Sequence, residues 1–526
     1  MRILTKGAWR AVAMLEALAG LLLLSELALG AERQLGASSI ESRRVAVSRT
    51  TRRAWRLAVI MLAVATLRPG QSHAANLITL VNFCSLPKCA DGAGPQAGLV
   101  ADSSGNLFGT TNGGGANGIG TVFEVAKSAT GYTSTAKTLV SFSGVPDGDF
   151  PTASVIIDHS GNLLGTTTGG GIVNAGTVFE VVKTTGGYAH TDKVLVSFNY
   201  TDGLDPFAGL LADASGNLLG TTTELFNNVG GANGTVFEVG RTASGYASSP
   251  TVLVNFIGKD GSTPAAGLIS DSTGNLLGTT VGGGPNGSSG EVFEIARTAS
   301  GYGTTPKIIV AFHFGIGGGG GAGNLVADAS GNLFGTSQGD GENGNFGTVY
   351  EVGKTLSGYS RTPKFLVSFG SLPNCPNGET QPSGLIVDAR GNLFGTTSGC
   401  GSSGSNGTVF EVAKTASGYA DIPTVLVAFD ISDGVFPLGG LIADARGNLF
   451  GTTAGGGTND GGTIFEVTDC GFVPFAFAGQ PGKANCHGKS VSALAQKYGG
   501  MKSAATALGF PSVQALQDAI KAFCGG

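Results

Sequence analysis

The chain repeats a fixed pattern of short apolar runs separated by turn residues. In the first copy the runs cover 98–102, 106–111, 120–125 and 138–142, and they are called runs A, B, C and D below. Each run has the length of a strand, and glycine, asparagine or serine stands between the runs. Runs B and C are apolar on both faces, as Leu107 beside Phe108 shows. The pattern predicts four-stranded sheets that are buried on both faces.

Seven copies of this unit follow one another. The tripeptide Gly-Asn-Leu in run B recurs at spacings of 56, 55, 58, 57, 60 and 56 residues, starting at Gly105, Gly161, Gly216, Gly274, Gly331, Gly391 and Gly447. A four-stranded meander of this length is one blade of a β-propeller, so we predict an all-β, seven-bladed β-propeller of four-stranded blades over residues 75–467. A parallel β-helix is the rival architecture, but its coils are usually shorter.

The two ends of the repeat are offset by one strand, which predicts how the ring closes. The first apolar run, 78–83, matches run D, whereas the last copy ends with its run C at 463–467. We therefore expect the first strand to complete the seventh blade as its outermost strand, which leaves no open sheet edge. Alternation along each meander places the D-to-A and B-to-C connections on one side, the loop face. The A-to-B and C-to-D turns lie on the other side, the turn face.

The amino-acid sequence of the repeat resembles that of a known family. Gly-Asn-Leu-Phe-Gly-Thr-Thr, followed by Gly-Gly-Gly and by Gly-Thr-Val-Phe-Glu-Val, looks like the GloVer tandem repeat of bacterial exported proteins, over roughly residues 77–467. The resemblance implies a propeller-like repeat, often in proteins with varied C-terminal surface anchors. It implies no activity and no catalytic residues. After Val467 the sequence contains no apolar C-terminal helix or sorting motif, so a surface anchor is not predicted here.

The first 74 residues have the features of an export region. Apolar stretches at 11–29 and 57–67 each follow basic residues, and Ser72-His73-Ala74 places small residues at a signal-peptidase site. We interpret 57–67 as the core of the signal, and 11–29 as either an upstream start or a membrane anchor. Thr51-Arg52-Arg53 also leaves twin-arginine export open. The expected location is the periplasm, the cell surface or the extracellular space.

Charge excludes some partners. The first 74 residues hold 11 Lys/Arg and 4 Asp/Glu, so residues 75–526 keep 20 basic and 32 acidic side chains. A domain this acidic repels a phosphate backbone, which argues against nucleic acid as a partner. It is also not a polybasic membrane binder, and stable membrane insertion after signal removal is not expected.

Seven cysteines follow the export region, and disulfides are the default in an exported chain. We predict the pairs Cys84–Cys89 and Cys375–Cys400, both on the loop face. Residues 468–485 have the composition of a linker, and helical runs at 490–498, 502–508 and 512–523 indicate a small helical domain at 486–526. A core this small needs a covalent cross-link for stability, and Cys486 and Cys524 are the candidates for a disulfide. Cys470 is then the odd thiol, or it pairs with one of these two.

Several polar residues recur once in each blade and favour a structural interpretation. Each A-to-B hairpin starts with one aspartate, whereas calcium needs about six to eight oxygen ligands, so turn hydrogen bonding explains these residues better. The glutamates of run C suggest a repeated ladder or ion pair. The tyrosines after each C-to-D glycine could form a sugar-stacking ring, but capping of the blade edges is the favoured interpretation. The aspartates are Asp102, Asp158, Asp213, Asp271, Asp328, Asp388 and Asp444, and the tyrosines are Tyr132, Tyr188, Tyr246, Tyr302, Tyr359 and Tyr419.

No catalytic, cofactor or metal site is predicted. His159, His190 and His313 belong to different blades, so no Ser-His-Asp or Cys-His group can be assembled. Carboxylates that could serve glycoside cleavage form only a pool in the loop-face connections. They are Asp147, Asp149, Asp202, Asp205, Asp260, Asp340, Glu342 and Asp433.

The function we predict is therefore that of an exported, non-catalytic binding or scaffold protein that uses the loop face. The alternative is a carbohydrate-active hydrolase or lyase with carboxylates near the propeller axis. The sequence does not identify the ligand, and a polysaccharide or another envelope component is the expected class.

Overall fold

A computed structural model describes residues 75–224, 233–285, 289–313, 319–321, 323–338, 347–369, 383–399 and 406–474, and a few single positions between 494 and 517. The chain divides into two units, 1–72 and 73–526, and all described residues belong to the second. The predicted export region and nearly all of the predicted helical domain at 486–526 lie outside the described residues. The described part of the chain forms no α-helical element with defined bounds, and none of its helical residues belongs to a helix that could span a membrane.

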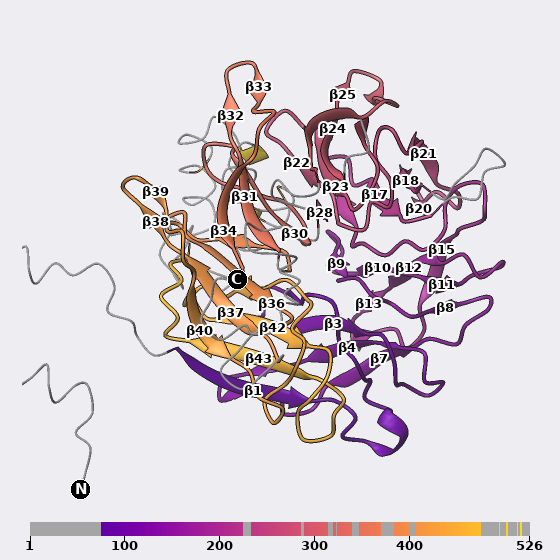
Figure 1. The fold of residues 1–526 in the computed structure, drawn as a ribbon. Helices are drawn as coiled ribbons and strands as arrows, with labels where there is room; N and C mark the ends of the chain where they lie inside the picture. The colour runs from indigo at the N-terminus through magenta and orange to yellow at the C-terminus, as the bar shows by residue number, and fades with distance from the viewer. Residues whose placement is uncertain are drawn as a thin grey trace, which may run out of the picture. The chain divides into compact units, whose positions relative to one another are not determined.

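The described residues form an all-β, seven-bladed propeller with four-stranded blades (Figure 1). Each blade is an antiparallel meander, and its strands follow runs A to D from the inside outward. Blade 1 contains β2 (Val100–Ala101), β3 (Leu107–Thr111), β4 (Thr121–Val125) and β7 (Lys137–Ser141). Blade 2 contains β9 (Ile156–Ile157), β10 (Leu163–Thr167), β12 (Thr177–Val181) and β15 (Lys193–Ser197). Blade 3 contains β16 (Leu211–Ala212), β17 (Leu218–Thr222), β18 (Thr235–Val239) and β21 (Thr251–Asn255).

The remaining blades repeat this order. Blade 4 contains β22 (Ile269–Ser270), β23 (Leu276–Thr280), β24 (Glu291–Ile295) and β27 (Lys307–Ala311). Blade 5 contains β29 (Val326–Ala327), β30 (Leu333–Gln338), β31 (Thr348–Val352) and β34 (Lys364–Ser368), and β28 (Gly319–Gly321) also pairs with β30. Blade 6 contains β35 (Ile386–Val387), β36 (Leu393–Thr397), β37 (Thr408–Val412) and β40 (Thr424–Ala428). Blade 7 contains β41 (Ile442–Ala443), β42 (Leu449–Thr453), β43 (Thr463–Thr468) and β1 (Asn76–Asn82).

Blade 7 is assembled from both ends of the repeat, as predicted. Strand β1 pairs antiparallel with β43, with Asn76 opposite Thr468 (Figure 1). Phe83 follows β1 and is fully buried in one cluster with Ile464 of blade 7 and Phe123 of blade 1. The ring is thus closed by sheet pairing and core packing between segments almost four hundred residues apart.

The core lies between blades and explains the shared motif. Each cluster combines the facing sides of two neighbours, as Leu164 and Val178 of blade 2 pack with Phe237 of blade 3. The glycine in Gly-Thr-Thr faces the aromatic ring of run C, and a Cβ at Gly109 would lie 2.6 Å from the Phe123 ring. A larger residue at this position would displace the ring and weaken the contact between blades.

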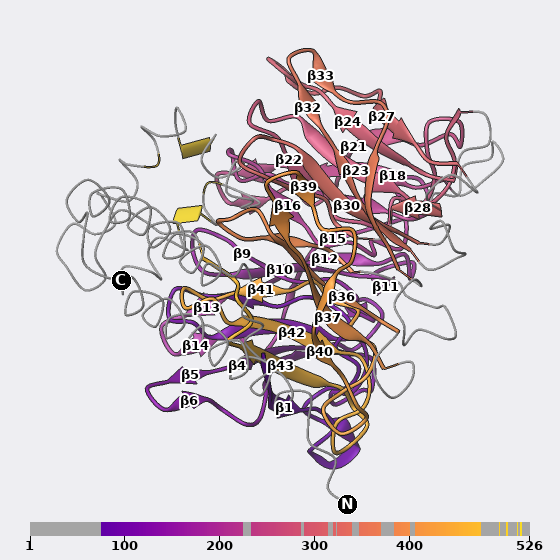
Figure 2. The same cartoon turned by 60° about the vertical axis from the view of Figure 1, so that its left-hand side comes forward.

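Two features of the turn face differ from the sequence prediction. The strand formed by run A has only two residues in each blade. The C-to-D turns form separate two-stranded ribbons. Strands β5 and β6 of one such ribbon are visible at one side in Figure 2. The ribbons are β5 (Lys127–Ser128) with β6 (Gly131–Tyr132), β13 (Lys183–Thr184) with β14 (Gly187–Tyr188), β19 (Arg241–Thr242) with β20 (Gly245–Tyr246), β25 (Arg297–Thr298) with β26 (Gly301–Tyr302), β32 (Lys354–Thr355) with β33 (Gly358–Tyr359), and β38 (Lys414–Thr415) with β39 (Gly418–Tyr419). The loop face adds β8 (Gly148–Asp149), which pairs with β11 (Gly169–Gly170), and the 3-10 turn η1 (Pro87–Cys89).

Candidate functional site

Each A-to-B hairpin is closed by its aspartate. The Asp102 carboxylate accepts hydrogen bonds from the backbone N–H groups of Ser104 and Asn106, both at 2.9 Å, and from Nδ2 of Asn106 at 3.0 Å. The other six hairpin aspartates accept the same bonds. These residues are turn formers, as predicted, and the described residues contain no group of three or more His, Cys, Asp or Glu side chains that could hold a metal ion.

The turn-face tyrosines lie between blades. The Arg297 guanidinium stacks over the Tyr302 ring at 4.2 Å and forms an ion pair at 3.3 Å with Asp213 in the preceding blade. Burial raises the pKa of Tyr302 to about 12. Cation–ring contacts recur at the other five ribbons, and three more ion pairs reach the preceding blade. The tyrosines therefore cap blade edges and do not form an exposed stacking ring.

The run C glutamates complete the turn-face network. Three of them pair with a lysine at the start of the neighbouring outermost strand, at 2.7–3.9 Å, in the pairs Glu124–Lys137, Glu180–Lys193 and Glu294–Lys307. Four accept a hydrogen bond from the asparagine of Gly-Asn-Leu. The expected repeated ion pair is thus present, and it joins two strands of one blade.

The loop face has a repeated backbone frame of its own. Phe150 has a φ of 51°, donates its N–H to the carbonyl of Ile119 in the preceding blade at 2.9 Å, and accepts a bond from the N–H of Thr168 at 3.3 Å. A proline follows it and fixes the direction of the loop. Gly94, Asp205, Thr263 and Phe436 occupy the equivalent place, each with positive φ. The same frame therefore presents Gly, Asp, Thr or Phe, and phenylalanine occurs twice, at Phe150 and Phe436.

Four of the loop-face carboxylates predicted as a pool cap their own loops. Asp147, Asp202, Asp260 and Asp433 each accept the backbone N–H of the residue that follows the last phenylalanine of the preceding blade, at 2.7–2.9 Å. These bonds satisfy donors that would otherwise be lost where the chain leaves the sheet. Asp340 and Glu342 lie outside the described residues.

Asp149 and Asp205 form no such cap. Oδ1 of Asp149 is buried with no hydrogen-bond partner among the described residues. Burial, and then the neighbouring Asp147 carboxylate, raise the pKa of Asp149. Burial, and then Glu224, raise the pKa of Asp205. No Lys or Arg of the described residues contributes to either shift, so negative charge on this part of the loop face is not compensated.

The innermost positions of the ring carry no carboxylate. The residue two places before each innermost strand is small in five blades and is Ser154 or Asn324 in the other two. A Cβ at Gly98 would lie 2.9 Å from the carbonyl oxygen of Gly440, and the Gly267 N–H donates to Oδ1 of Asn324 at 2.7 Å. These positions are thus filled by small or amide residues that contact the neighbouring blade, and no carboxylate of the pool is among them.

Large apolar side chains are exposed at several places on the loop face, such as Ile431, Phe436 and Leu438 in the connection into blade 7, and one group gathers at blades 2 and 3. We call it the blade 2–3 surface, and it consists of Phe150, Ile172, Val173, Tyr200 and Phe207, of which Ile172 is 75% exposed and Phe207 46%. Two hydrogen bonds bring its segments together, from the Tyr200 hydroxyl to the carbonyl of Val173 and from the Thr152 hydroxyl to the carbonyl of Phe207, both at 3.2 Å. Sequence reasoning missed this surface, although apolar residues within glycine-rich loops were the available signal.

The sequence matches one family model along most of its length. Residues 66–285, 186–374 and 288–507 each match the model of the Gloeobacter/Verrucomicrobia repeat. The chain belongs to the Gloeobacter/Verrucomicrobia repeat family. The resemblance inferred from the repeated motif is thereby confirmed, and the family description names no activity. No curated protein matches the chain.

Solved structures similar to this repeat protein share only its fold. Virginiamycin B lyase from Staphylococcus aureus is 14% identical, covers 75% of this chain and 99% of its own, and has a TM-score of 0.46. A gluconolactonase from Xanthomonas campestris is 12% identical, with coverages of 75% and 89% and a TM-score of 0.34. A family AA12 carbohydrate-active enzyme from Trichoderma reesei is 12% identical, with coverages of 64% and 95% and a TM-score of 0.36. Likeness this low assigns no activity.

Glu291 is an ionisable residue that sequence reasoning missed. The other six units of the Gloeobacter/Verrucomicrobia repeat place threonine at this position, where its hydroxyl bonds to a Thr or Ser of the second strand at 2.7–2.8 Å. Glu291 is fully buried, and neither carboxylate oxygen has a hydrogen-bond partner among the described residues. Burial, with a smaller contribution from Asp260, raises the pKa of Glu291 to about 7. The break in the repeat itself was the signal.

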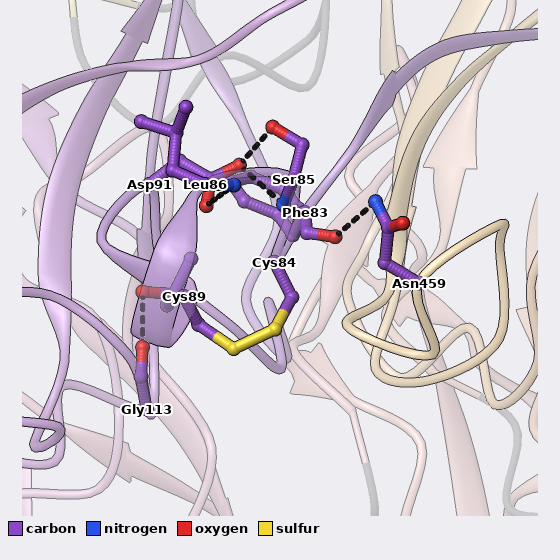
Figure 3. The surroundings of a disulfide bond; sticks show 9 residues. Phe83, Cys84, Ser85, Leu86, Cys89, Asp91, Gly113 and Asn459 are labelled. Carbon is purple, nitrogen blue, oxygen red and sulfur yellow. Dashed lines mark hydrogen bonds between the residues drawn. A yellow bond between two sulfur atoms is a disulfide. The ribbon is translucent and has the colours of Figure 1, made fainter.

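Cys84 and Cys89 form the predicted disulfide, which closes the loop around η1 (Figure 3). Beside it, Asp91 accepts hydrogen bonds from the N–H and hydroxyl of Ser85 at 2.9 and 2.6 Å (Figure 3). Cys470 is a free, buried thiol whose Sγ donates to the carbonyl of Gly447 at 3.3 Å, and burial raises its pKa. The predicted pairs Cys375–Cys400 and Cys486–Cys524 lie outside the described residues.

Proposed function

We propose that this member of the Gloeobacter/Verrucomicrobia repeat family is an exported, non-catalytic binding or scaffold protein that uses its loop face. The observation that carries the proposal is the contrast between the two faces. On the turn face nearly every recurring polar side chain is used in hairpins and contacts between blades. On the loop face a repeated backbone frame holds side chains that differ from blade to blade, which is how propellers acquire binding specificity.

The position of the carboxylates argues for binding over catalysis. A pair of acids that cleaves a glycoside must face one substrate across roughly 5–10 Å. Four of the six described loop-face candidates are committed to capping their own loops. The innermost ring positions hold Gly, Ser and Asn. A hydrolase or lyase remains the alternative that the experiment below must exclude.

The experiment is incubation of the full-length protein with polysaccharides and cell-envelope fractions, with retention and released fragments scored together. Retention without fragments is expected. Release of fragments that is lost in Asp149→Asn or Asp205→Asn would replace the binding proposal with the enzyme. Secretion of the protein, followed by N-terminal sequencing of the mature form, tests export and expects a new N-terminus at Ala75.

We also propose that residues 486–526 form a small helical domain stapled by Cys486 and Cys524, as the apolar spacing of this segment predicts. Peptide mapping without reduction is expected to recover this pair and Cys375–Cys400. Recovery of either pair as free thiols would remove the corresponding part of the proposal.

A further inference from the structure

The blade 2–3 surface is apolar at its centre. Phe150 and Phe207 are 42% and 46% exposed, and Ile172 and Val173 extend the surface outward along the B-to-C loop of blade 2. The equivalent of Phe150 is Gly94, Asp205 or Thr263 in three other blades and Phe436 in blade 7, so only some blades carry an apolar side chain there. Exposed apolar side chains that are contiguous mark interaction surfaces more often than scattered single ones do.

The loop face around this surface is acidic. Among the described D-to-A and B-to-C connections, ten Asp or Glu side chains stand against two lysines, Lys88 and Lys259. The acidic residues are Asp91, Asp147, Asp149, Asp202, Asp205, Glu224, Asp260, Asp430, Asp433 and Asp460. On the turn face, by contrast, seven ion pairs join acidic to basic side chains. Among the described residues of the propeller, the loop face therefore carries the larger share of the excess negative charge.

We infer that the blade 2–3 surface docks a cationic segment of a partner protein, one that carries Lys or Arg beside apolar side chains. This inference rests on the proposed binding function and names its partner class. Negative charge attracts and orients such a segment, and the apolar centre supplies the contact area. Acidic polymers are repelled. The surface also exposes the rings of Phe150, Tyr200 and Phe207, on which a neutral sugar could stack, so a neutral glucan is the competing ligand that the test below includes.

The test measures binding of the full-length protein to three probes. They are a synthetic peptide of Lys and Leu residues, the same peptide with Glu in place of Lys, and a soluble neutral glucan. The cationic peptide is expected to bind at least about tenfold more tightly than the acidic one, and its affinity is expected to fall as salt is added.

Two double variants test the apolar and the acidic side chains of the surface separately. Ile172→Ser with Phe207→Ser is expected to weaken binding of the cationic peptide about tenfold, because exposed apolar anchors carry much of such contacts. Asp205→Asn with Glu224→Gln is expected to weaken it less and to reduce its salt dependence. Asp421→Asn with Ile422→Ser is the matched control, because these neighbours are an exposed acid and an exposed apolar residue on the turn face. Thermal unfolding of each variant checks that the fold is intact.

The outcomes separate this inference from the proposed function. Equal binding of both peptides, or equal loss in the control, overturns the cationic docking site. Glucan binding that depends on Ile172 and Phe207 also overturns it, but leaves a loop-face binding function in place. If loop-face variants change neither probe binding nor retention on envelope fractions, both proposals fail.

Discussion

Two single residues show where the repeat is broken and what that costs. Tyr350 takes the place held by phenylalanine in the other six blades, and Glu291 takes the place held by threonine. Both are fully buried, and their polar atoms have no partner among the described residues. A buried polar atom without a partner loses its hydration and gains nothing in return. Substitution of a buried residue usually lowers the free energy of unfolding. At these two positions we expect substitution to raise it.

Tyr350→Phe is expected to raise the free energy of unfolding by about 1–3 kcal/mol, the cost of a buried hydroxyl without a partner. The ring would keep its contact with Phe312, whose centroid lies 5.0 Å away. Chemical unfolding of both proteins measures the difference. Phe312→Leu serves as the control, because it removes part of the same ring pair and is expected to destabilise. A less stable Tyr350→Phe protein would show that the hydroxyl has a partner.

Glu291→Thr is expected to change the pH dependence of stability. Its pKa is about 7 in the folded protein and 4.5 in the reference state. As pH rises from about 4.5 to about 7, the unfolded chain loses this proton first, so the unfolding free energy of the natural protein falls by about 3 kcal/mol. Below that window the contribution of Glu291 does not vary, and above it the full penalty remains.

Removing the carboxyl should remove this slope. Unfolding of the natural protein, of Glu291→Thr and of Glu291→Gln is measured at acid pH and at about pH 8. At the higher pH, both variants are expected to be more stable than the natural protein. Asp421→Asn, which changes an exposed carboxylate, should leave the slope as it is. A natural slope retained in both Glu291 variants would assign it to another group.

At the scale of the element, the sequence predicted strands well and contacts between blades poorly. Runs B, C and D became strands because apolar residues on both faces demand burial on both sides. The ribbons after run C were missed, because their stability comes from partners in the preceding blade. Arg297 and Asp213 are 84 residues apart in sequence, and only packing of one blade against another brings them together. The capping role of Asp202 has a different origin, since its bond to the N–H of Asn199 is local, and the sequence pattern did not distinguish this cap from a free carboxylate.

The residues that follow blade 7 give the clearest example of a contact between blades that the sequence did not predict. Residues 469–472 are shorter than the other ribbons, yet Phe472 packs edge-to-face against Phe394 of blade 6, with ring centroids 5.1 Å apart, as Tyr419 does against Phe334 of blade 5 at 5.4 Å. Val473 continues this contact by donating its N–H to the Asp388 carboxylate at 3.3 Å. The sequence signalled a change of composition after run C, but not that the first residues beyond it still complete a blade interface.

The contact between blades predicts a measurable contribution from the turn face. Arg297→Ala removes both a cation–ring contact and an ion pair to the preceding blade, and is expected to lower the unfolding free energy by about 1–2 kcal/mol. Lys307→Ala in the same blade is the control. Its side chain is 61% exposed and its ion pair lies within the blade, so a loss below about 0.5 kcal/mol is expected. Equal losses would mean that the stacked arginine adds nothing between blades.

At the scale of the whole molecule, stability depends on one seam without a covalent link. Strand β1 meets β43 only through sheet pairing and the core that they share, whereas strands inside every other blade are also joined by short connections. Opening at this seam would expose two sheet edges and the apolar faces of blades 7 and 1. We therefore expect the seam to be the place where unfolding begins.

A disulfide across the seam tests this directly. Ile78 stands opposite Glu466 in blade 7, and Thr251 stands opposite Glu238 at the same place in blade 3. A cross-link between cysteines replacing Ile78 and Glu466 would enclose the whole propeller, whereas the matched pair would enclose one hairpin. Chain entropy predicts gains of about 6 and about 3 kcal/mol as upper values. Comparing oxidised with reduced protein within each variant cancels the effect of the substitutions.

The difference between the two variants carries the conclusion. If unfolding starts at the seam, the blade 7 cross-link should raise the unfolding temperature and slow unfolding, because β1 can no longer leave first. The blade 3 cross-link should change the unfolding rate little, since it joins strands that separate only after the ring has opened. Equal slowing by both would instead place the first opening elsewhere and would make the closed ring, not its seam, the unit that resists unfolding.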